Sequence, residues 1–361
     1  MSNLQRLLDA AESRCTGSLL FDFGGYHLRF YSNSTALITA LRSYYRYFLA
    51  TVDSAEDAVV VGLQMPVPEI DGDWQTIVPA AGKPHPKEAL LTLATGTLVR
   101  KLNSDLHTFI SADIGTERRV CFGDLQANLN QLINIINNVH LDALLSTSGQ
   151  LLHAAGVCKG QFGLALAGKS GQGKSTLALR LLQRGMNLVS NDRLVVQRQA
   201  EQQVMHGIAK YPRINPGTIV HQPELRGMLA PADMARYEAM SFADLWLLED
   251  KYDALIEPAF GVEFVLHSSL QMFIALDWDH TSTESCRLEP CLPQDCPQLV
   301  ETVMKAPDIG LPRAHARIPA AVLATYTDVL SQCPCFVLSG GVDFDRAADL
   351  VLDYVSSISK T

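Results

Sequence analysis

Apolar and polar positions alternate in short runs through the first 145 residues, which is the pattern of strands that bury one face. Residues 19–31 alternate around Gly24-Gly25, so a hairpin is predicted there. Apolar residues spaced three and four apart predict amphipathic helices within 35–49 and 125–143. Further short strands are predicted at 58–63, 96–102, 107–111 and 119–122, with an exposed loop at 65–86.

We therefore expect residues 1–147 to form a smaller N-terminal α+β domain. Nothing in its sequence places a nucleophile, a base and an orienting group together, so a docking or assembly role is expected. The polar stretch 146–150 marks the expected boundary.

The pattern changes in the second half of the chain, where strands alternate with helices. Strands are predicted at 151–157 and 162–167 around the turn Lys159-Gly160, followed by a glycine-rich loop, a helix at 176–184 and a strand at 187–189. Later strands are predicted at 272–276 and 335–338, with a closing helix at 344–356. Residues 148–361 are therefore expected to form an α/β domain that binds a nucleotide.

The glycine-rich loop carries the clearest chemistry. Residues 168–175 read GKSGQGKS and fit the pattern GxxxxGK[ST], with a strand before the loop and a helix after it. Glycines let backbone N–H groups turn inward around phosphate oxygens, while Lys174 reaches the β- and γ-phosphates and Ser175 ligates Mg²⁺. The sequence therefore predicts ATP and Mg²⁺ as cofactors. The residues expected to contact the nucleotide are Gly168, Lys169, Ser170, Gly171, Gln172, Gly173, Lys174, Ser175 and Thr176.

Two further residues are candidates for proton transfer. Asp192 follows a predicted strand, where a carboxylate can bind Mg²⁺ or accept a proton from an attacking hydroxyl. His153 precedes the loop by fifteen residues, on a strand expected to run beside the loop strand. Asp192 is the favoured base, and His153 is the alternative.

Candidate phosphate-binding groups cluster in two later segments. The first, KYPRINPGT at 210–218, is bracketed by prolines and presents Arg213, whose planar guanidinium suits bidentate anion recognition. The second, ELRG at 224–227, combines Glu224 with Arg226. Both arginines are candidate catalytic residues. The turn GGVDF at 340–344 is expected either to border the nucleotide or to open the last helix, with Asp343 as its cap.

Composition narrows the class of protein. The chain has 361 residues, a formal net charge of −9 and no basic block, which argues against a protein that coats nucleic acid. Its eight cysteines contain no CxxC pair and are expected to be free thiols without a metal. The first residues lack the apolar run of a secretory signal, and no run approaches a membrane span. A cytoplasmic protein is expected.

The order of these motifs along the chain resembles that of the HPr kinase/phosphorylase family. That family has a His, then fifteen residues on a GxSGxGKS loop, a helix ending in Arg-Gly, a strand running into an acidic pair, and an E-x-R-G signature. The matching elements here are His153, residues 168–175, Arg184-Gly185, Asn191-Asp192 and residues 224–227. The match covers about residues 150–280. The strings LLHAAGV, LVSNDR, PRINPGT and GGVDF look most like the HPr-kinase-related kinase B branch.

The resemblance implies a P-loop kinase core of the HPr kinase/phosphoenolpyruvate-carboxykinase-like type. It implies that Lys174 and Ser175 handle phosphates and metal, that Glu224 is a second metal-associated carboxylate, and that Asp192 takes the second position of the acidic pair. An ATP-grasp enzyme from the same gene neighbourhood is the partner it implies, and a homo-oligomer is expected by analogy.

Two departures from the family pattern matter. Asn191 stands where the family's general base is found, and an amide cannot accept the proton. Residues 252–276 contain no Arg or Lys, so the family's arginine for phosphorolysis has no counterpart there, and phosphorylase activity is not expected.

The sequence thus predicts an ATP-dependent kinase that phosphorylates a hydroxyl of a small molecule or a protein serine. Two alternatives stay open. One is a nucleotide-gated binding or assembly module that hydrolyses ATP slowly, which the missing first carboxylate favours. The other is phosphotransfer to or from a non-hydroxyl group. The sequence leaves the acceptor and the choice between ATP and GTP undetermined.

Overall fold

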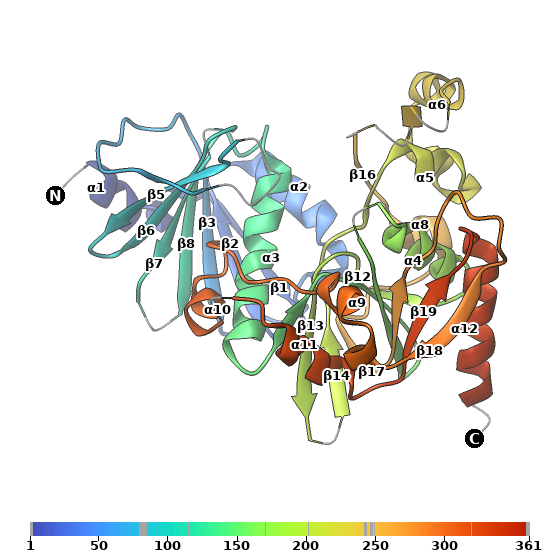
Figure 1. The fold of residues 1–361 in the computed structure, drawn as a ribbon. Helices are drawn as coiled ribbons and strands as arrows, with labels where there is room; N and C mark the ends of the chain where they lie inside the picture. The colour runs from blue at the N-terminus through green and yellow to red at the C-terminus, as the bar shows by residue number, and fades with distance from the viewer. Residues whose placement is uncertain are drawn as a thin grey trace. The chain divides into compact units, whose positions relative to one another are not determined.

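The chain forms a mixed α/β protein with several sheets (Figure 1). The computed structural model describes residues 3–78, 85–104, 106–113, 116–169, 171–200, 202–241, 244–245, 248, 250–318 and 320–358. Backbone contacts divide the chain into two compact units, Met1–His140 and Leu141–Thr361. Over the described ranges, no helix combines the length and apolar character needed to cross a membrane.

The first unit contains an eight-stranded sheet with the order β1-β2-β3-β8-β7-β6-β5-β4. Its strands are β1 (Gly17–Asp22), β2 (His27–Ser32), β3 (Ala58–Gln64), β4 (Gln75–Thr76), β5 (Glu88–Leu93), β6 (Gly96–Lys101), β7 (His107–Ser111) and β8 (Glu117–Gly123). Its helices are α1 (Asn3–Asp9), α2 (Thr35–Tyr44) and the start of α3 (Leu129–Ser146). Leucine, valine and phenylalanine side chains from α1, β3, β6 and β8 form its core.

Several predictions for this unit are confirmed. β1 and β2 pair antiparallel with Asp22 opposite His27, which is the expected hairpin. The helix predicted at 35–49 ends at Tyr44 and is followed by a short 3-10 turn, Arg46–Phe48. The prediction missed β5, which pairs with β6, and it missed β4, which lies within the loop predicted at 65–86 and pairs with β5.

The second unit is built on a mixed nine-stranded sheet. Its strands are β9 (Gln150–Leu152), β10 (Ala155–Lys159), β11 (Phe162–Ala167), β12 (Asn187–Ser190), β13 (Leu194–Gln199), β14 (Gln202–His206), β17 (His267–Leu276), β18 (Arg287–Cys291) and β19 (Cys335–Ser339). The central strand β11 runs parallel to β17 and antiparallel to β10, and β17 runs parallel to β19. The parallel strands β11, β17 and β19 therefore end at the same edge of the sheet.

The strand predicted at 151–157 is wrong in one respect, because the structure breaks it at His153-Ala154. Before the break, Leu151 and Leu152 pair with β13. After it, β10 pairs with β11 and β12. Because the two halves pair with different strands, His153 lies between the end of β9 and the start of β10.

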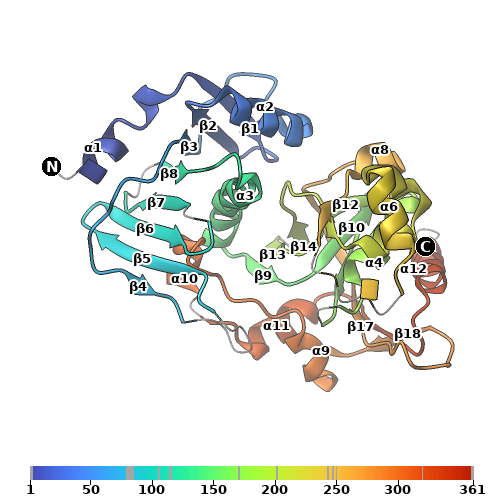
Figure 2. The ribbon, with the colours of Figure 1, turned by 90° about the horizontal axis from the view of Figure 1, so that it is seen from above.

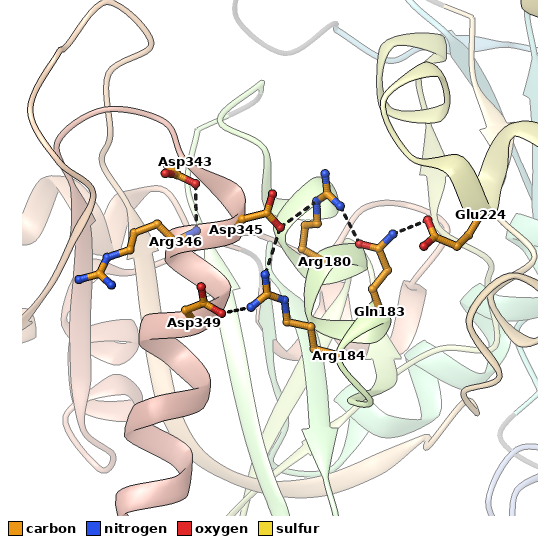
Figure 3. A network of polar contacts seen from close by, with 8 residues as sticks. All are labelled: Arg180, Gln183, Arg184, Glu224, Asp343, Asp345, Arg346 and Asp349. Atoms are coloured by element: carbon orange, nitrogen blue, oxygen red, sulfur yellow. Dashed lines mark hydrogen bonds and ion pairs between the residues drawn. The ribbon is translucent and has the colours of Figure 1, made fainter.

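The helices of the second unit connect and cover this sheet. They are α4 (Lys174–Gln183), α5 (Pro216–Val220), α6 (Pro231–Glu238), α8 (Ile256–Phe260), α9 (Pro297–Glu301), α10 (Pro312–Arg317), α11 (Leu323–Leu330) and α12 (Phe344–Ile358). The views in Figures 1 and 2 agree in placing α4 beside α12. Arg184, which follows α4, forms ion pairs with Asp345 and Asp349 of α12 (Figure 3).

Candidate functional site

The glycine-rich loop joins the end of β11 to the start of α4. Gly171 and Gly173 have φ values of 85° and 84°, which favour glycine because other side chains are strained in this region. Gly173 is also crowded, since a Cβ there would lie 2.6 Å from Cζ of Phe344. These two positions therefore require glycine for the loop to close over the helix end. Ser170, also expected to contact the nucleotide, lies outside the described residues.

The loop is shaped by hydrogen bonds from its own polar groups. The backbone N–H of Lys169 donates to Oε1 of Gln172 at 2.7 Å. Nζ of Lys174 donates to the carbonyls of Gly168 and Lys169 at 2.7 and 3.3 Å. Burial lowers the pKa of Lys174, and the charge of Asp192 opposes that shift. The lysine side chain thus lies across the mouth of the loop, where phosphate oxygens would meet it.

An aromatic pair supports the loop from the neighbouring strand ends. Trp278 follows β17, and its Nε1 donates to the carbonyl of Gln172 at 2.9 Å. Its ring meets that of Phe344 edge-on, with centroids 5.0 Å apart. Oδ1 of Asp343 accepts from the N–H of Arg346 at 2.9 Å, which is an N-cap contact for α12. The GGVDF turn therefore packs on the loop and caps the last helix.

The register of the strands places Asp192 at the same edge of the sheet as the glycine-rich loop. In the antiparallel pair β10–β12, Gly156 lies opposite Ser190, and in β10–β11, Ala155 lies opposite Leu166. The end of β12, the start of β10 and the end of β11 therefore share one edge of the sheet. This edge carries Asp192, His153 and the glycine-rich loop.

At this edge Nε2 of His153 lies 3.0 Å from Oδ1 of Asp192, and Nζ of Lys305 lies 3.8 Å from Oδ2. Partial burial opposes ionisation of the carboxyl group. The hydrogen bond from His153 and the charges of Lys305 and Arg193 outweigh it, and hold the pKa of Asp192 well below its usual range. Asp192 is therefore an ionised carboxylate at neutral pH.

The oxygens near the loop suit Mg²⁺ held together with phosphates. Oδ1 of Asn191 is buried and meets no hydrogen-bond donor among the described residues, so it is available to a cation or its waters. Asp192 and the hydroxyl of Ser175 add oxygen ligands of the kind Mg²⁺ prefers. In the part of the chain that the structure describes, no three His, Cys, Asp or Glu side chains form a metal cage.

The structure does not bring Glu224 to this edge. Its Oε2 accepts from Nε2 of Gln183 at 2.6 Å, and Oε1 of Gln183 accepts from Nη1 of Arg180 at 2.9 Å (Figure 3). Gln183 is the last residue of α4, about 12 Å along the helix from Ser175 at 1.5 Å per residue. Glu224 thus belongs to a polar network at the far end of α4. A metal-binding role for it remains a prediction that this arrangement does not support.

The two candidate arginines also have protein partners. Nη2 of Arg226 pairs with Oε1 of Glu238 at 2.8 Å, and Nε donates to the carbonyl of Val220. Nε of Arg213 lies 3.5 Å from Oδ1 of Asp253. Burial lowers the pKa of Lys210, and the charge of Arg213 adds to this shift, whereas the charge of Asp192 opposes it.

The proline-bracketed segment that follows Arg213 lies against the start of α4. Oγ1 of Thr218 is 3.4 Å from Oγ1 of Thr176, one of the residues expected to contact the nucleotide. Oδ1 of Asn215 accepts from the N–H and the hydroxyl of Thr218 at 3.1 and 2.9 Å, which caps α5 and orients the threonine.

Sequence reasoning missed one cation of the site. Lys305 comes from a segment after α9 that carries no motif. Its neighbour Met304 pairs with Leu152 at the end of β9, and Nζ of Lys305 lies 3.8 Å from Oδ2 of Asp192. A cavity of about 330 Å³ lies beside the loop, lined in part by Lys169, Gln172, Asp277 and Thr302. Asp277 directly follows the strand predicted at 272–276. Pairing that strand in parallel with the one predicted at 162–167 would have placed Asp277 beside the loop.

Comparison with known proteins gives a distant resemblance. No protein family matches this chain, and no curated protein matches it. Among solved structures, the Hpr(Ser) kinase/phosphatase from Coxiella burnetii is similar over 58% of this chain and 99% of its own, with 13% identity and a TM-score of 0.30. This is a distant and partial structural likeness.

Proposed function

We propose that the unit Leu141–Thr361 is an ATP-dependent kinase that transfers the γ-phosphate to a hydroxyl group. The observation that carries the proposal is the contact between His153 and Asp192 at the sheet edge that also carries the GKSGQGKS loop. A phosphate-binding loop alone fits many nucleotide-binding proteins. An ionised, oriented carboxylate beside it is the additional group that would orient an attacking hydroxyl and accept its proton.

The loop would hold the nucleotide through its backbone N–H groups, the N-terminal end of α4 and Lys174. Mg²⁺, when bound by Ser175 and Asp192 with help from Asn191, would neutralise charge on the transferring phosphate. Binding of phosphates would replace the carbonyls of Gly168 and Lys169 as partners of the Lys174 ammonium. Chemistry of this kind depends on positioning and charge neutralisation more than on a strong base.

Asp192 is the favoured proton acceptor for the attacking hydroxyl. One of its oxygens lies 3.0 Å from Nε2 of His153, and the other, 3.8 Å from Nζ of Lys305, is the oxygen that would accept the proton. His153 orients the carboxylate and stabilises its charge. A general base that is oriented by a hydrogen-bonded partner is a common arrangement in enzymes that activate a nucleophile.

The rival function is a nucleotide-gated module that hydrolyses ATP slowly. The observation that favours it is Asn191, whose buried amide oxygen meets no donor among the described residues and could orient a water. The two functions differ in where the phosphate appears. A kinase places it on an acceptor, whereas a slow ATPase releases it as inorganic phosphate.

The deciding experiment uses the full chain, γ-labelled ATP with Mg²⁺ and a metabolite extract from the source cells. We expect label on a discrete acceptor with the wild type, and loss of that label with Asp192→Asn. Lys159→Gln, an exposed change at the end of β10, is the matched control and should behave as the wild type. Label found only as inorganic phosphate would support the nucleotide-gated module instead.

A further inference from the structure

We propose that the cavity beside the glycine-rich loop binds the nucleoside end of the nucleotide, with Asp277 contacting the ribose hydroxyls and residues 295–302 contacting the base. The proposal rests on the function proposed above, in which the loop binds the triphosphate and Asp192 faces its γ-phosphate. It deepens that function by assigning a second part of the nucleotide to residues that the phosphate-loop motif does not include.

The cavity has the size and the mixed lining of a small-molecule site. Its volume is about 330 Å³, and the apolar residues Leu276 and Leu299 line it together with polar residues. Sites for small ligands usually occupy about 300–1,000 Å³ and combine apolar walls with a few polar groups. The polar residues of the lining are Lys169, Gln172, Asp277, Asp295, Gln298 and Thr302.

The order of the strands decides which end of the nucleotide faces the cavity. β11, which leads into the loop, lies between β10 and β17, and β12 lies beyond β10. Asp192 follows β12 and Asp277 follows β17, so the two carboxylates lie on opposite sides of the loop along the sheet edge. Because the γ-phosphate must face Asp192 for transfer, the α-phosphate and the nucleoside extend toward β17 and the cavity.

The separation of these strands argues against the cavity as the binding site of the acceptor. β12 and β17 are three steps apart in the sheet, which corresponds to about 14 Å at about 4.8 Å per step. A small acceptor whose hydroxyl meets Asp192 does not reach Asp277 across this width. A nucleotide does, because its phosphate chain lies across the loop between the two residues.

The polar side chains of the lining are available to a nucleoside. Within the part of the chain that the structure describes, Asp277, Asp295 and Gln298 make no side-chain hydrogen bond or ion pair. A carboxylate accepts hydrogen bonds, and an amide both donates and accepts them. Ribose hydroxyls and the N–H groups of a base are donors, and the ring nitrogens of a base are acceptors. The two sets of groups are therefore complementary.

The register of β17 places Asp277 for the sugar. Ala167, the last residue of β11, lies opposite Ala275 in the parallel pair β11–β17, so Asp277 lies level with the first residues of the loop. The ribose is the part of a nucleoside that is attached to the phosphates. It is therefore the part that meets Asp277 when the phosphates fill the loop.

Another wall of the cavity comes from α9 and the turn before it. Asp295 ends the 3-10 turn Pro293–Asp295, Gln298 lies in α9, and Thr302 follows α9. The hydroxyl of Thr302 donates to the carbonyl of Leu299 at 2.7 Å, so its oxygen can still accept a hydrogen bond from a ligand. This wall offers several acceptors and one amide, which are the groups that recognise a base.

The test compares the affinities of the full chain for Mg-ATP, Mg-2′,3′-dideoxy-ATP and Mg-tripolyphosphate, measured by calorimetry. The dideoxy nucleotide lacks the ribose hydroxyls, and tripolyphosphate fills the loop without reaching the cavity. We expect the wild type to bind ATP about 10-fold more tightly than dideoxy-ATP, because hydrogen bonds to a charged group are lost in the latter.

Variants assign this preference to the cavity. Asp277→Ala should weaken ATP binding by about 10-fold and remove the preference over dideoxy-ATP. Its affinity for tripolyphosphate should stay equal or rise, because a negative charge beside the phosphates is gone. Thr302→Trp, which fills the cavity, should weaken both nucleotides and leave tripolyphosphate binding unchanged. Asp353→Ala is the matched control, since this exposed carboxylate lies about 13 Å along α12 from Phe344 at 1.5 Å per residue.

Three results would overturn the proposal. The first is equal affinity of the wild type for ATP and dideoxy-ATP. The second is wild-type affinity for ATP in both Asp277→Ala and Thr302→Trp. The third is an equal loss of tripolyphosphate binding in both variants, which would show that they act on the loop. Binding of neither ATP nor tripolyphosphate by the wild type would instead refute the loop as a nucleotide site, and with it the proposed function.

Discussion

Nε2 of His153 lies 3.0 Å from Oδ1 of Asp192, although the two residues come from different strand ends. His153 occupies the break between β9 and β10, and Asp192 follows β12. Because β10 pairs antiparallel with both β11 and β12, the break, the end of β12 and the glycine-rich loop meet at one edge. The contact is therefore a product of strand order, and several expectations about the site depend on it.

The first expectation concerns nucleotide binding. Lys174→Ala removes the ammonium at the mouth of the loop and should abolish measurable Mg-ATP binding. The fold should be little affected, because the substitution removes only two hydrogen bonds within the loop. Calorimetry and thermal unfolding of the same preparation check both parts. Unchanged affinity for Mg-ATP would show that the loop is not the nucleotide site.

The second expectation concerns the base. Asp192→Asn keeps the shape of the side chain but removes its charge, and phosphate transfer should fall by ~10²–10⁴-fold. Asn191→Asp should be tolerated, since it restores a second carboxylate beside the loop. Initial rates of transfer to the labelled acceptor measure both variants. Full activity in Asp192→Asn would move the role of base to His153.

The third expectation separates two roles for Glu224. If it belongs to the network with Gln183 and Arg180, Glu224→Gln should change the Mg²⁺ dependence of nucleotide binding by less than about 3-fold, because the carboxylate does not touch the metal. Loss of a metal ligand or of the group that supports it costs about 10–100-fold in metal affinity. A Mg²⁺ titration at fixed ATP distinguishes the outcomes, and a large loss would restore the metal role that the family resemblance implies.

The fourth expectation concerns pH. The pKa of Lys210 is lowered to about 8 by burial and by Arg193. A lysine whose folded-state pKa is lowered destabilises the fold below that value, and the cost disappears as pH rises from about 8 toward the unfolded pKa. Lys210→Met should therefore raise the free energy of unfolding at pH 7 by about 1–3 kcal/mol, with little effect above pH 10. Urea unfolding at both pH values tests the sign, and a destabilised variant at pH 7 would contradict it.

The fifth expectation concerns the first unit. Nη2 and Nε of Arg119 contact Oε1 of Glu117 at 2.6 and 2.9 Å, and the two side chains are only 1% and 5% exposed. Glu117→Ala leaves the buried guanidinium without this carboxylate and should destabilise the fold by about 3–5 kcal/mol. The exposed pair of Glu284 and Arg287 offers a control, since Glu284→Ala should cost less than about 1 kcal/mol. Equal effects in denaturant unfolding would mean that the buried pair is not structurally important.

Much of the local structure was predictable from the sequence. The alternation around Gly24-Gly25 predicted the β1–β2 hairpin, and the apolar run before the glycines predicted β11 at 162–167. The helix predicted at 176–184 after the glycine-rich loop is present as α4, although it begins two residues earlier, at Lys174. These features depend on residues close together in the chain, because turn conformation, strand alternation and helix entry are set by local backbone preferences.

The composition of the site, in contrast, was decided by tertiary structure. Lys305 joins Asp192 because a tyrosine of α11 holds its backbone beside β9, and no motif marks that segment. The family resemblance implies a metal-associated role for Glu224, but its carboxylate is hydrogen-bonded to Gln183 at the end of α4. Which side chains meet at a sheet edge depends on strand order and register, and these are set by the packing of segments far apart in the chain. The sequence by itself therefore determined the loop and its flanking elements, whereas long-range pairing decided which charges surround them.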